Sequence, residues 1–247
     1  AFEIAGIKDD TDVVGIVKKD GKPTGELEEI KAVITFVAKL PPLDAKTLLK
    51  ATWDAAKLAH RTGVTTFADL SFGTIPGGYK AYQTVAADPN YPIRIVMNPL
   101  IQIFESGDIA AKGGLDYLTE MHKSDTDRLS FGGVKFVADG SLQGYTGLFL
   151  WPYYYKTFAN GLANISQEDL NKWVLEVHKR GFQAVIHANA DGATDMALKA
   201  LAEAQRQSPQ FATRHRIEHN QLVTQEQLEQ MKQLGVATNL FTNHIYY

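Results

Sequence analysis

Three side chains that can bind a metal ion stand at or near the ends of apolar, strand-like runs: Lys135, His187 and His219. A single histidine at a strand end is more often a hydrogen-bonded structural residue than a ligand. Two histidines that end neighbouring strands, with a lysine in the strand before them, favour a metal site, because zinc and similar ions prefer imidazole and oxygen donors. We therefore predict that these residues bind one or two divalent metal ions, with zinc as the first choice.

Lys135 lies inside its apolar run, where an ammonium group is costly to bury. The side chain can reach solvent at the strand end, pair with a carboxylate such as Asp139, or act as a neutral amine. It can also react with carbon dioxide to form a carbamate, an anionic oxygen ligand that can bridge two metal ions. The sequence leaves these alternatives open.

Two carboxylates follow the same runs. Asp139 stands four residues after Lys135 in an Asp-Gly-Ser sequence, and Asp191 stands four residues after His187. We predict that both carboxylates contribute to binding a substrate. Asp191 can equally cap the helix that begins near Ala193.

The run that contains His219 has its own pattern. Strand alternation places His215, Ile217 and His219 on one face, and Arg216 and Glu218 on the other. The remaining histidines are predicted to be solvated or ordinary loop residues, with a substrate contact as the alternative for the last of them: His60, His122, His178 and His244. The sequence has no G-x-S-x-G, Walker A or G-x-G-x-x-G motif.

From about residue 63 onward, short β-rich runs alternate with amphipathic helical stretches. The predicted strands are residues 63–70, 92–98, 133–138, 182–188, 214–219 and 235–241. The predicted helices are marked by Asp44 before a helix through His60, the capping pairs Ser166 with Asp169 and Thr224 with Gln227, and an apolar stripe over residues 193–207. This pattern predicts an α/β fold, an incomplete (β/α)8 TIM-barrel-like arrangement with about six of eight strands.

The first 43 residues lie outside this alternation. A short apolar run, a turn at Asp20-Gly21 and a second run through Leu27 predict a hairpin. We therefore divide the chain into residues 1–43, part of an insertion or subdomain, and residues 44–247, a partial barrel.

Composition limits the possible partners. With 247 residues, 25 basic and 28 acidic side chains and a formal charge of −3, the chain lacks the basic surface that binds nucleic acid. No apolar run is long enough to predict a membrane span, and the absence of cysteine excludes thiolate metal sites. We expect a small-molecule substrate, neither nucleic acid nor membrane as a partner, and a cytoplasmic location. We also expect a homo-oligomer that covers the open sheet edges.

Taken in order, these segments resemble the amidohydrolase superfamily, in the branch of metal-dependent hydrolases related to N-substituted formamide deformylase (amidohydrolase 3 type). The resemblance rests on Gly25-Glu26-Leu27, Gly63-Val64-Thr65-Thr66, Lys135 with Asp139-Gly140-Ser141, His187 with Asp191, and Arg214-His215-Arg216-Ile217-Glu218-His219. It implies a distorted (β/α)8 barrel with a metal centre at the C-terminal rim. In that barrel Lys135 would be the carboxylated bridging lysine, and His187 and His219 would end the fifth and sixth strands.

The resemblance also implies a function. Family members carry an H-x-H pair on the first strand and an Asp on the last, and neither is found here, so we expect an internal piece of a larger enzyme that is inactive alone. The intact enzyme is expected to hydrolyse a non-peptide C–N bond, in an amide, formamide or cyclic imide, with a metal-activated water. The alternatives are a non-catalytic α/β module that binds a small molecule, and an isomerase or deaminase on the same barrel.

Overall fold

The computed structural model describes residues 2–103, 107–155 and 159–241. Its strands are β1 (Ile16–Lys19), β2 (Lys22–Leu27), β3 (Thr66–Phe72), β4 (Arg94–Pro99), β5 (Leu129–Phe131), β6 (Val134–Val137), β7 (Ala184–Ala188), β8 (Arg216–His219) and β9 (Ala237–Leu240). Its helices are α1 (Phe2–Ala5), α2 (Glu29–Val37), α3 (Ala45–Arg61), α4 (Gly78–Ala87), the 3-10 turn η1 (Ile101–Ile103), α5 (Gly107–Ala111), α6 (Leu115–His122), α7 (Gln167–Lys179), α8 (Asp191–Gln207) and α9 (Gln225–Leu234).

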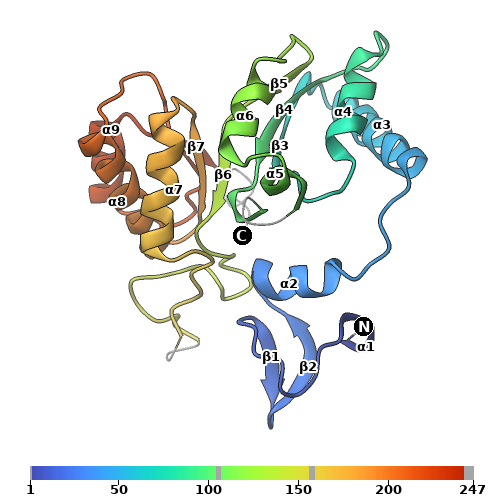
Figure 1. Cartoon of the computed structure of the whole chain (residues 1–247). Coiled ribbons are helices and arrows are strands. Elements are labelled where there is room, and N and C mark those ends of the chain that lie inside the picture. Colours follow the sequence, from blue (N-terminus) through green and yellow to red (C-terminus); the bar gives the residue numbers. More distant parts are fainter. Residues whose placement is uncertain (1, 104–106, 156–158, 242–247) are drawn as a thin grey trace.

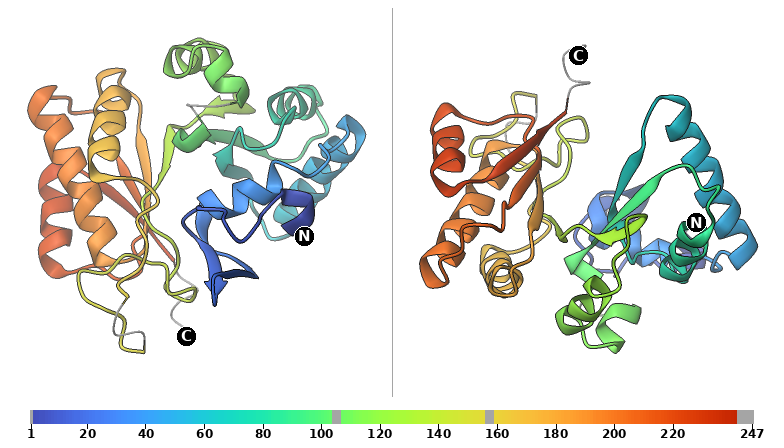
Figure 2. Two further views of the ribbon diagram at one scale, coloured as in Figure 1. Left: turned by 60° about the horizontal axis from the view of Figure 1, so that its bottom comes forward. Right: turned by 90° about the horizontal axis from the view of Figure 1, so that it is seen from above.

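The strands from β3 to β9 form two parallel sheets, each in sequential order. One sheet is β3-β4-β5, the other is β6-β7-β8-β9, and a parallel bridge between Leu100 and Lys135 connects them. Helices α3, α4 and α6 flank the first sheet and α7, α8 and α9 flank the second, with the strands on the inner side (Figure 1; Figure 2). This sequential parallel arrangement confirms the predicted α/β fold of an incomplete barrel.

All six predicted strands are present, with bounds shifted by a few residues, and β5 is an additional strand that the sequence analysis missed. β5 pairs with β4, and β6 pairs with β7, so residues 129–137 form one nearly continuous strand between two neighbours. The interruption is Gly132-Gly133. A Cβ at Gly132 would lie 2.4 Å from Val96 Cγ1, and one at Gly133 would lie 2.5 Å from the Gln183 carbonyl oxygen. These glycines therefore permit close approach to neighbours on both sides.

The predicted helices begin where their capping residues stand. Asp44, Ser166 and Thr224 each accept a hydrogen bond from the backbone N–H three residues later, at the start of α3, α7 and α9. Thr224 and Gln227 form a reciprocal capping box, and α9 ends at Gly235 in the left-handed conformation. Along α8, the predicted apolar stripe is buried over its alanines and Leu201 against the second sheet and α7.

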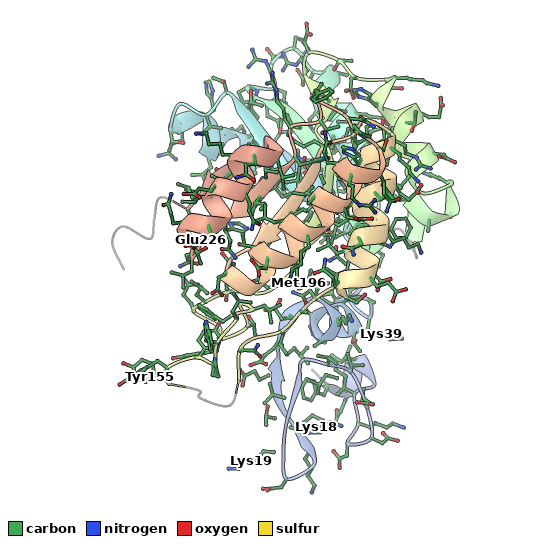
Figure 3. The ribbon with its side chains drawn as sticks, turned by 90° about the vertical axis from the view of Figure 1, so that its left-hand side faces the viewer. Lys18, Lys19, Lys39, Tyr155, Met196 and Glu226 are labelled. Carbon is green, nitrogen blue, oxygen red and sulfur yellow. The ribbon has the colours of Figure 1, made fainter. Side chains whose placement is uncertain are left out.

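The N-terminal residues form the predicted hairpin. β1 and β2 pair antiparallel, and α2 follows directly. This segment has a small core of its own, which consists of Ala5, Ile7, Ile16 and Ala32, separate from the core beneath the sheets. Lys19 projects from the hairpin away from the rest of the molecule (Figure 3), whereas Lys18 Nζ donates to the Asp9 carbonyl at 2.7 Å. The division at residue 43 stays a prediction.

None of the helices in the described ranges is long and apolar enough to cross a bilayer.

His178 is buried, contrary to the prediction that it is solvated. Its Nε2–H donates to the Ser208 carbonyl at 2.6 Å, so its Nδ1 accepts from His215 Nε2–H at 2.7 Å. The Nδ1 of His215 in turn accepts the backbone N–H of Ala184 at 2.9 Å. Both rings must be neutral for this chain of hydrogen bonds to exist. Burial, and secondarily the neighbouring His178, lowers the pKa of His215 to about 4.

We predict that Gly132→Ala lowers the free energy of unfolding by about 1–3 kcal/mol, because the added methyl group overlaps Val96. Chemical denaturation measures the effect. Gly78→Ala is the control: it begins α4, and its added Cβ meets no atom within 4 Å. Equal stability of the two variants would contradict the close approach.

We further predict that stability falls as pH drops from 6.5 towards 4. In this window the unfolded chain protonates His215 while the folded chain does not, so folding loses up to about 3 kcal/mol, and the full stability is present above pH 6.5. Unfolding at pH 7.5 and 5 measures the slope. In His215→Asn, whose amide can still accept from Ala184, the slope should be smaller, and an unchanged slope would contradict the assignment.

Candidate metal centre

The register of the second sheet determines which side chains lie on its inner face, and several of them are polar. Residues that pair across parallel strands point to the same side, and alternate residues share that side. The inner set comprises Lys135, Val137, Val185, His187, Arg216, Glu218, Ala237 and Asn239. The opposite set includes Phe136, Ile186 and Ile217, which are fully buried and belong to the core that α7 and α8 share. Lys135 and His187 therefore face the interior of the partial barrel.

His219 joins this face through an irregular backbone. Alternation places it with Ile217 on the helix side, and that prediction is confirmed for His215 and Ile217 but wrong for His219. The backbone adopts positive φ angles of 73° at His219 and 47° at Asn220, which turns the chain at the end of β8. The His219 ring consequently packs against the His187 ring, with centroids 4.5 Å apart and planes at 73°. The two predicted imidazole ligands are brought together.

The His187 ring is oriented by a backbone carbonyl. Its Nε2 lies 2.9 Å from the Gly140 oxygen, an acceptor, so Nε2 carries the proton and Nδ1 carries the lone pair. Within the part of the chain that the structure describes, no hydrogen bond involves His187 Nδ1. A histidine that donates one N–H to a carbonyl and keeps the other nitrogen available is typical of a metal ligand.

Lys135 is 3% exposed, and its Nζ has no hydrogen-bond partner among the residues that the structure describes. Burial lowers the pKa of Lys135 to about 8; the neighbouring charges of Glu218 and Asp139 oppose this shift and that of Arg216 adds to it. A buried amine without a partner is rare in folded proteins, and a bound ion is one group that would satisfy it. Together with the two imidazoles it gives a donor set that fits a divalent ion.

That set depends on the lysine. Among the described residues, no group of three or more His, Asp or Glu side chains lies close enough together to hold a metal ion. The predicted site accordingly consists of two histidines and Lys135, as an amine or carbamate. The assignment of all three as ligands stays a prediction.

The two predicted substrate-binding carboxylates are engaged with the backbone. Asp139 is completely buried and accepts N–H groups from Asn189 at 2.9 Å, Leu148 at 3.0 Å and Ala190 at 3.1 Å. Its Oδ1 also lies 3.4 Å from His187 Nε2. The structure thus uses Asp139 to join the end of β6 to the end of β7; a contact with substrate stays a prediction.

Asp191 begins α8, two residues before the predicted start. Its Oδ1 accepts the N–H of Gly192 at 2.8 Å and that of Leu150 at 3.1 Å. This arrangement agrees with the alternative that the carboxylate caps the first turn of the helix. The bond to Leu150 also connects the long loop after β6 to that turn. A role for Asp191 in substrate binding stays a prediction.

Further polar groups at the site were not identified from the sequence. Asn189 donates its side-chain N–H to the Gly140 oxygen at 2.6 Å, the same oxygen that orients His187. Glu218 is 1% exposed and accepts from Arg216 and, at 2.7 Å, from Asn239. The alternation of Arg216 and Glu218 in the sequence is the signal that could have identified this second polar face. His244 lies outside the described residues.

Comparison with known proteins identifies the class. Residues 3–246 match the Amidohydrolase family, so the chain belongs to this family. This finding confirms the resemblance drawn from the sequence.

Two relatives are similar over nearly the whole chain. YtcJ of Bacillus subtilis (strain 168), a protein named as an amidohydrolase, is 27% identical over 247 residues, which is 97% of this chain and 44% of YtcJ. The protein LONG AFTER FAR-RED 3 of Arabidopsis thaliana is 28% identical over 257 residues, 99% of this chain and 43% of that protein. The chain therefore spans less than half the length of these relatives.

Solved structures share the fold. A metal-dependent hydrolase of Pyrococcus horikoshii OT3 superposes with a TM-score of 0.71 at 22% identity, covering 97% of this chain and 44% of that protein. A metal-dependent hydrolase of Pyrococcus furiosus gives 0.70 at 21% identity, with 97% and 46% covered. This likeness places the partial barrel among such hydrolase folds.

We predict that Lys135→Met raises the free energy of unfolding at pH 7 by about 1–2 kcal/mol, because methionine fills a similar volume without a buried charge. Denaturation at pH 7 tests this, with the exposed Lys199→Met on α8 as the control. A loss of stability in Lys135→Met would show that the amine has a stabilising role in the fold.

Proposed function

We propose that the protein is a metal-dependent hydrolase that cleaves a non-peptide C–N bond, in an amide, formamide or cyclic imide. The observation that carries this proposal is the packing of the His187 and His219 rings at the ends of neighbouring strands, on the face where the Lys135 amine is buried without a partner. Membership of the Amidohydrolase family and the similarity to two Pyrococcus proteins described as metal-dependent hydrolases support it.

We propose zinc as the metal, with Lys135, His187 and His219 as its ligands. A bound divalent ion would lower the pKa of a water molecule towards about 7 and polarise the scissile carbonyl. His187 would bind through Nδ1, since its Nε2–H donates to the Gly140 oxygen. Lys135 would contribute an oxygen ligand after carboxylation. The pKa of Lys135, lowered by burial to about 8, increases the fraction of neutral amine that can react with carbon dioxide.

The other residues of the site serve to exclude water and to hold the ligands. Asp139 and Asn189 fix the loop after β6 against the end of β7, next to His187. We assign no residue in the described ranges to proton transfer. For this reason, turnover by this chain alone is not part of the proposal.

Assembly is a separate proposal. β3 and β9 are the edge strands, and all four residues of β9 are exposed. We propose that a homo-oligomer covers these edges, because an unpaired strand edge readily pairs with another chain. Light scattering across a concentration series would detect this assembly, and a monomer at every concentration would oppose it.

We predict that His187→Ala and His219→Ala each reduce the zinc content of the purified protein at least tenfold, because each removes a ligand. Elemental analysis after dialysis measures the content. His60→Ala is the matched control, since His60 is exposed on α3. Near-normal metal in both variants would refute the assignment.

The same measurements separate the alternatives. A protein without tight metal would favour a non-catalytic module that binds a small molecule. With metal present, incubation with N-formyl amines, amides and cyclic imides, followed by assays for amine, ammonia and formate, identifies the bond that is cleaved. Rearranged products without hydrolysis would indicate an isomerase.

A further inference from the structure

Glu29, the first residue of α2, reaches the rim of the site from the N-terminal segment. Its Oε2 accepts the side-chain N–H of Asn164 at 2.8 Å, a contact between residues 135 positions apart. A Cβ at Gly140 would lie 2.0 Å from Glu29 Oε1, so the carboxylate packs directly on this glycine. In Figure 1, α2 correspondingly lies beside the loop that follows β6.

Asn164 extends this contact to the end of β6. Its side-chain N–H also donates to the Asp139 carbonyl at 3.0 Å, and its backbone N–H donates to the Ala138 carbonyl at 2.8 Å. Gly140 is therefore enclosed by Glu29 and Asn164 on one side. On the other side its carbonyl accepts from His187 at 2.9 Å and from Asn189 at 2.6 Å.

Tyr153 lies near both carboxylates. Burial, followed by the negative charge of Asp139 and then that of Glu29, raises the pKa of Tyr153 to about 12. The two carboxylates thus act on one phenol, whose O–H donates to the Gly147 carbonyl at 2.8 Å.

Two local features make this contact costly to maintain. Glu29 has a φ of 65°, in the left-handed region that disfavours residues with a side chain. Glycine at position 140 permits this close approach, because a methyl group there would overlap both the Glu29 carboxylate and, at 2.1 Å, Thr146 Oγ1. Backbone strain of this kind persists where the surrounding contacts enforce it, and it concentrates at functional sites.

We propose that Glu29 is a positioning residue of the metal site: by holding Asn164 and Gly140, it fixes the carbonyl that orients the His187 ring. This inference rests on the proposed function, in which His187 is a ligand. The proposal gives the N-terminal segment a role at the site. The sequence of the hairpin and α2 does not predict that role. Glu29 does not touch the metal; it acts through Gly140.

The test compares Glu29→Ala, Glu29→Gln and Glu29→Gly. The alanine variant should bind zinc about tenfold more weakly, which is the usual effect of losing support behind a ligand. The glutamine variant keeps an oxygen that accepts from Asn164 and should restore most of the affinity. The glycine variant relieves the strained φ, so its melting temperature should equal or exceed that of the wild type. Its zinc affinity should nevertheless fall as much as that of Glu29→Ala.

A second readout needs no metal. In the metal-free protein labelled with 15N-histidine, the Nε2 proton of His187 should exchange slowly with water in the wild type and in Glu29→Gln. It should exchange at least several-fold faster in Glu29→Ala. Glu26→Ala, an exposed carboxylate on β2, is the matched control and should leave the exchange rate and the zinc affinity unchanged.

The outcomes are decisive for each proposal separately. Unchanged exchange and unchanged zinc affinity in Glu29→Ala and Glu29→Gly would overturn the positioning role. The positioning role would also be overturned if zinc affinity fell only in proportion to a lower melting temperature and did not fall in the glycine variant. Glu29 would then have a purely structural role. If the wild type binds no zinc, the proposed function fails, while the exchange rates still decide whether Glu29 orients His187.

Discussion

The buried carboxylate of Asp139 is the interaction on which the organisation of the site depends. It is completely desolvated, and three backbone N–H groups from the loop after β6 and the turn after β7 satisfy it. Such charge-assisted bonds are strong in a low-dielectric interior, and leaving a buried carboxylate unpaired is costly. The ends of two strands and a long loop are therefore fixed relative to one another. Gly140, the next residue, is held in place as a consequence, and with it the carbonyl that orients His187.

The inner face of the second sheet carries polar groups that are costly to bury. A parallel strand buried on both faces is normally a continuous apolar run, yet this sheet places Lys135, Arg216 and Glu218 on its inner side. Glu218 is satisfied by Arg216 and Asn239, whereas no hydrogen bond to the described residues satisfies the amine of Lys135. Buried titratable groups with a shifted pKa concentrate at functional sites, and the proposed metal site gives Lys135 such a role.

The sequence predicted the strands and the ligand candidates because both follow from one local pattern, an apolar run that ends in a polar residue. It did not predict what depends on contacts between distant residues. In the sequence, Gly132-Gly133 is typical of a break between secondary-structure elements. In the structure, the glycines permit close strand packing that continues β5 into β6. Alternation is valid only for regular backbone, so the positive φ of His219 reversed its predicted side. The burial of His178 depends on its contact with His215, and the position of Glu29 depends on its contact with Gly140. No local sequence pattern predicts either contact.

Two histidine pairs lie at opposite ends of the second sheet: His178 on α7 with His215 just before β8, and His187 on β7 with His219 on β8. Near the N-terminal ends, His178 and His215 are buried, and each of their four ring nitrogens has a hydrogen-bond partner. Such a pair cannot take up a proton or a metal ion without losing a bond. At the C-terminal ends, His187 and His219 are half-buried and in edge-to-face contact, and one nitrogen of His187 is kept available because the other donates to Gly140. In parallel α/β barrels the C-terminal ends of the strands carry the reaction and the N-terminal ends carry stability. The hydrogen-bonding state of the imidazoles follows that division: all ring nitrogens of His178 and His215 are hydrogen-bonded, whereas Nδ1 of His187 makes no hydrogen bond to the described residues.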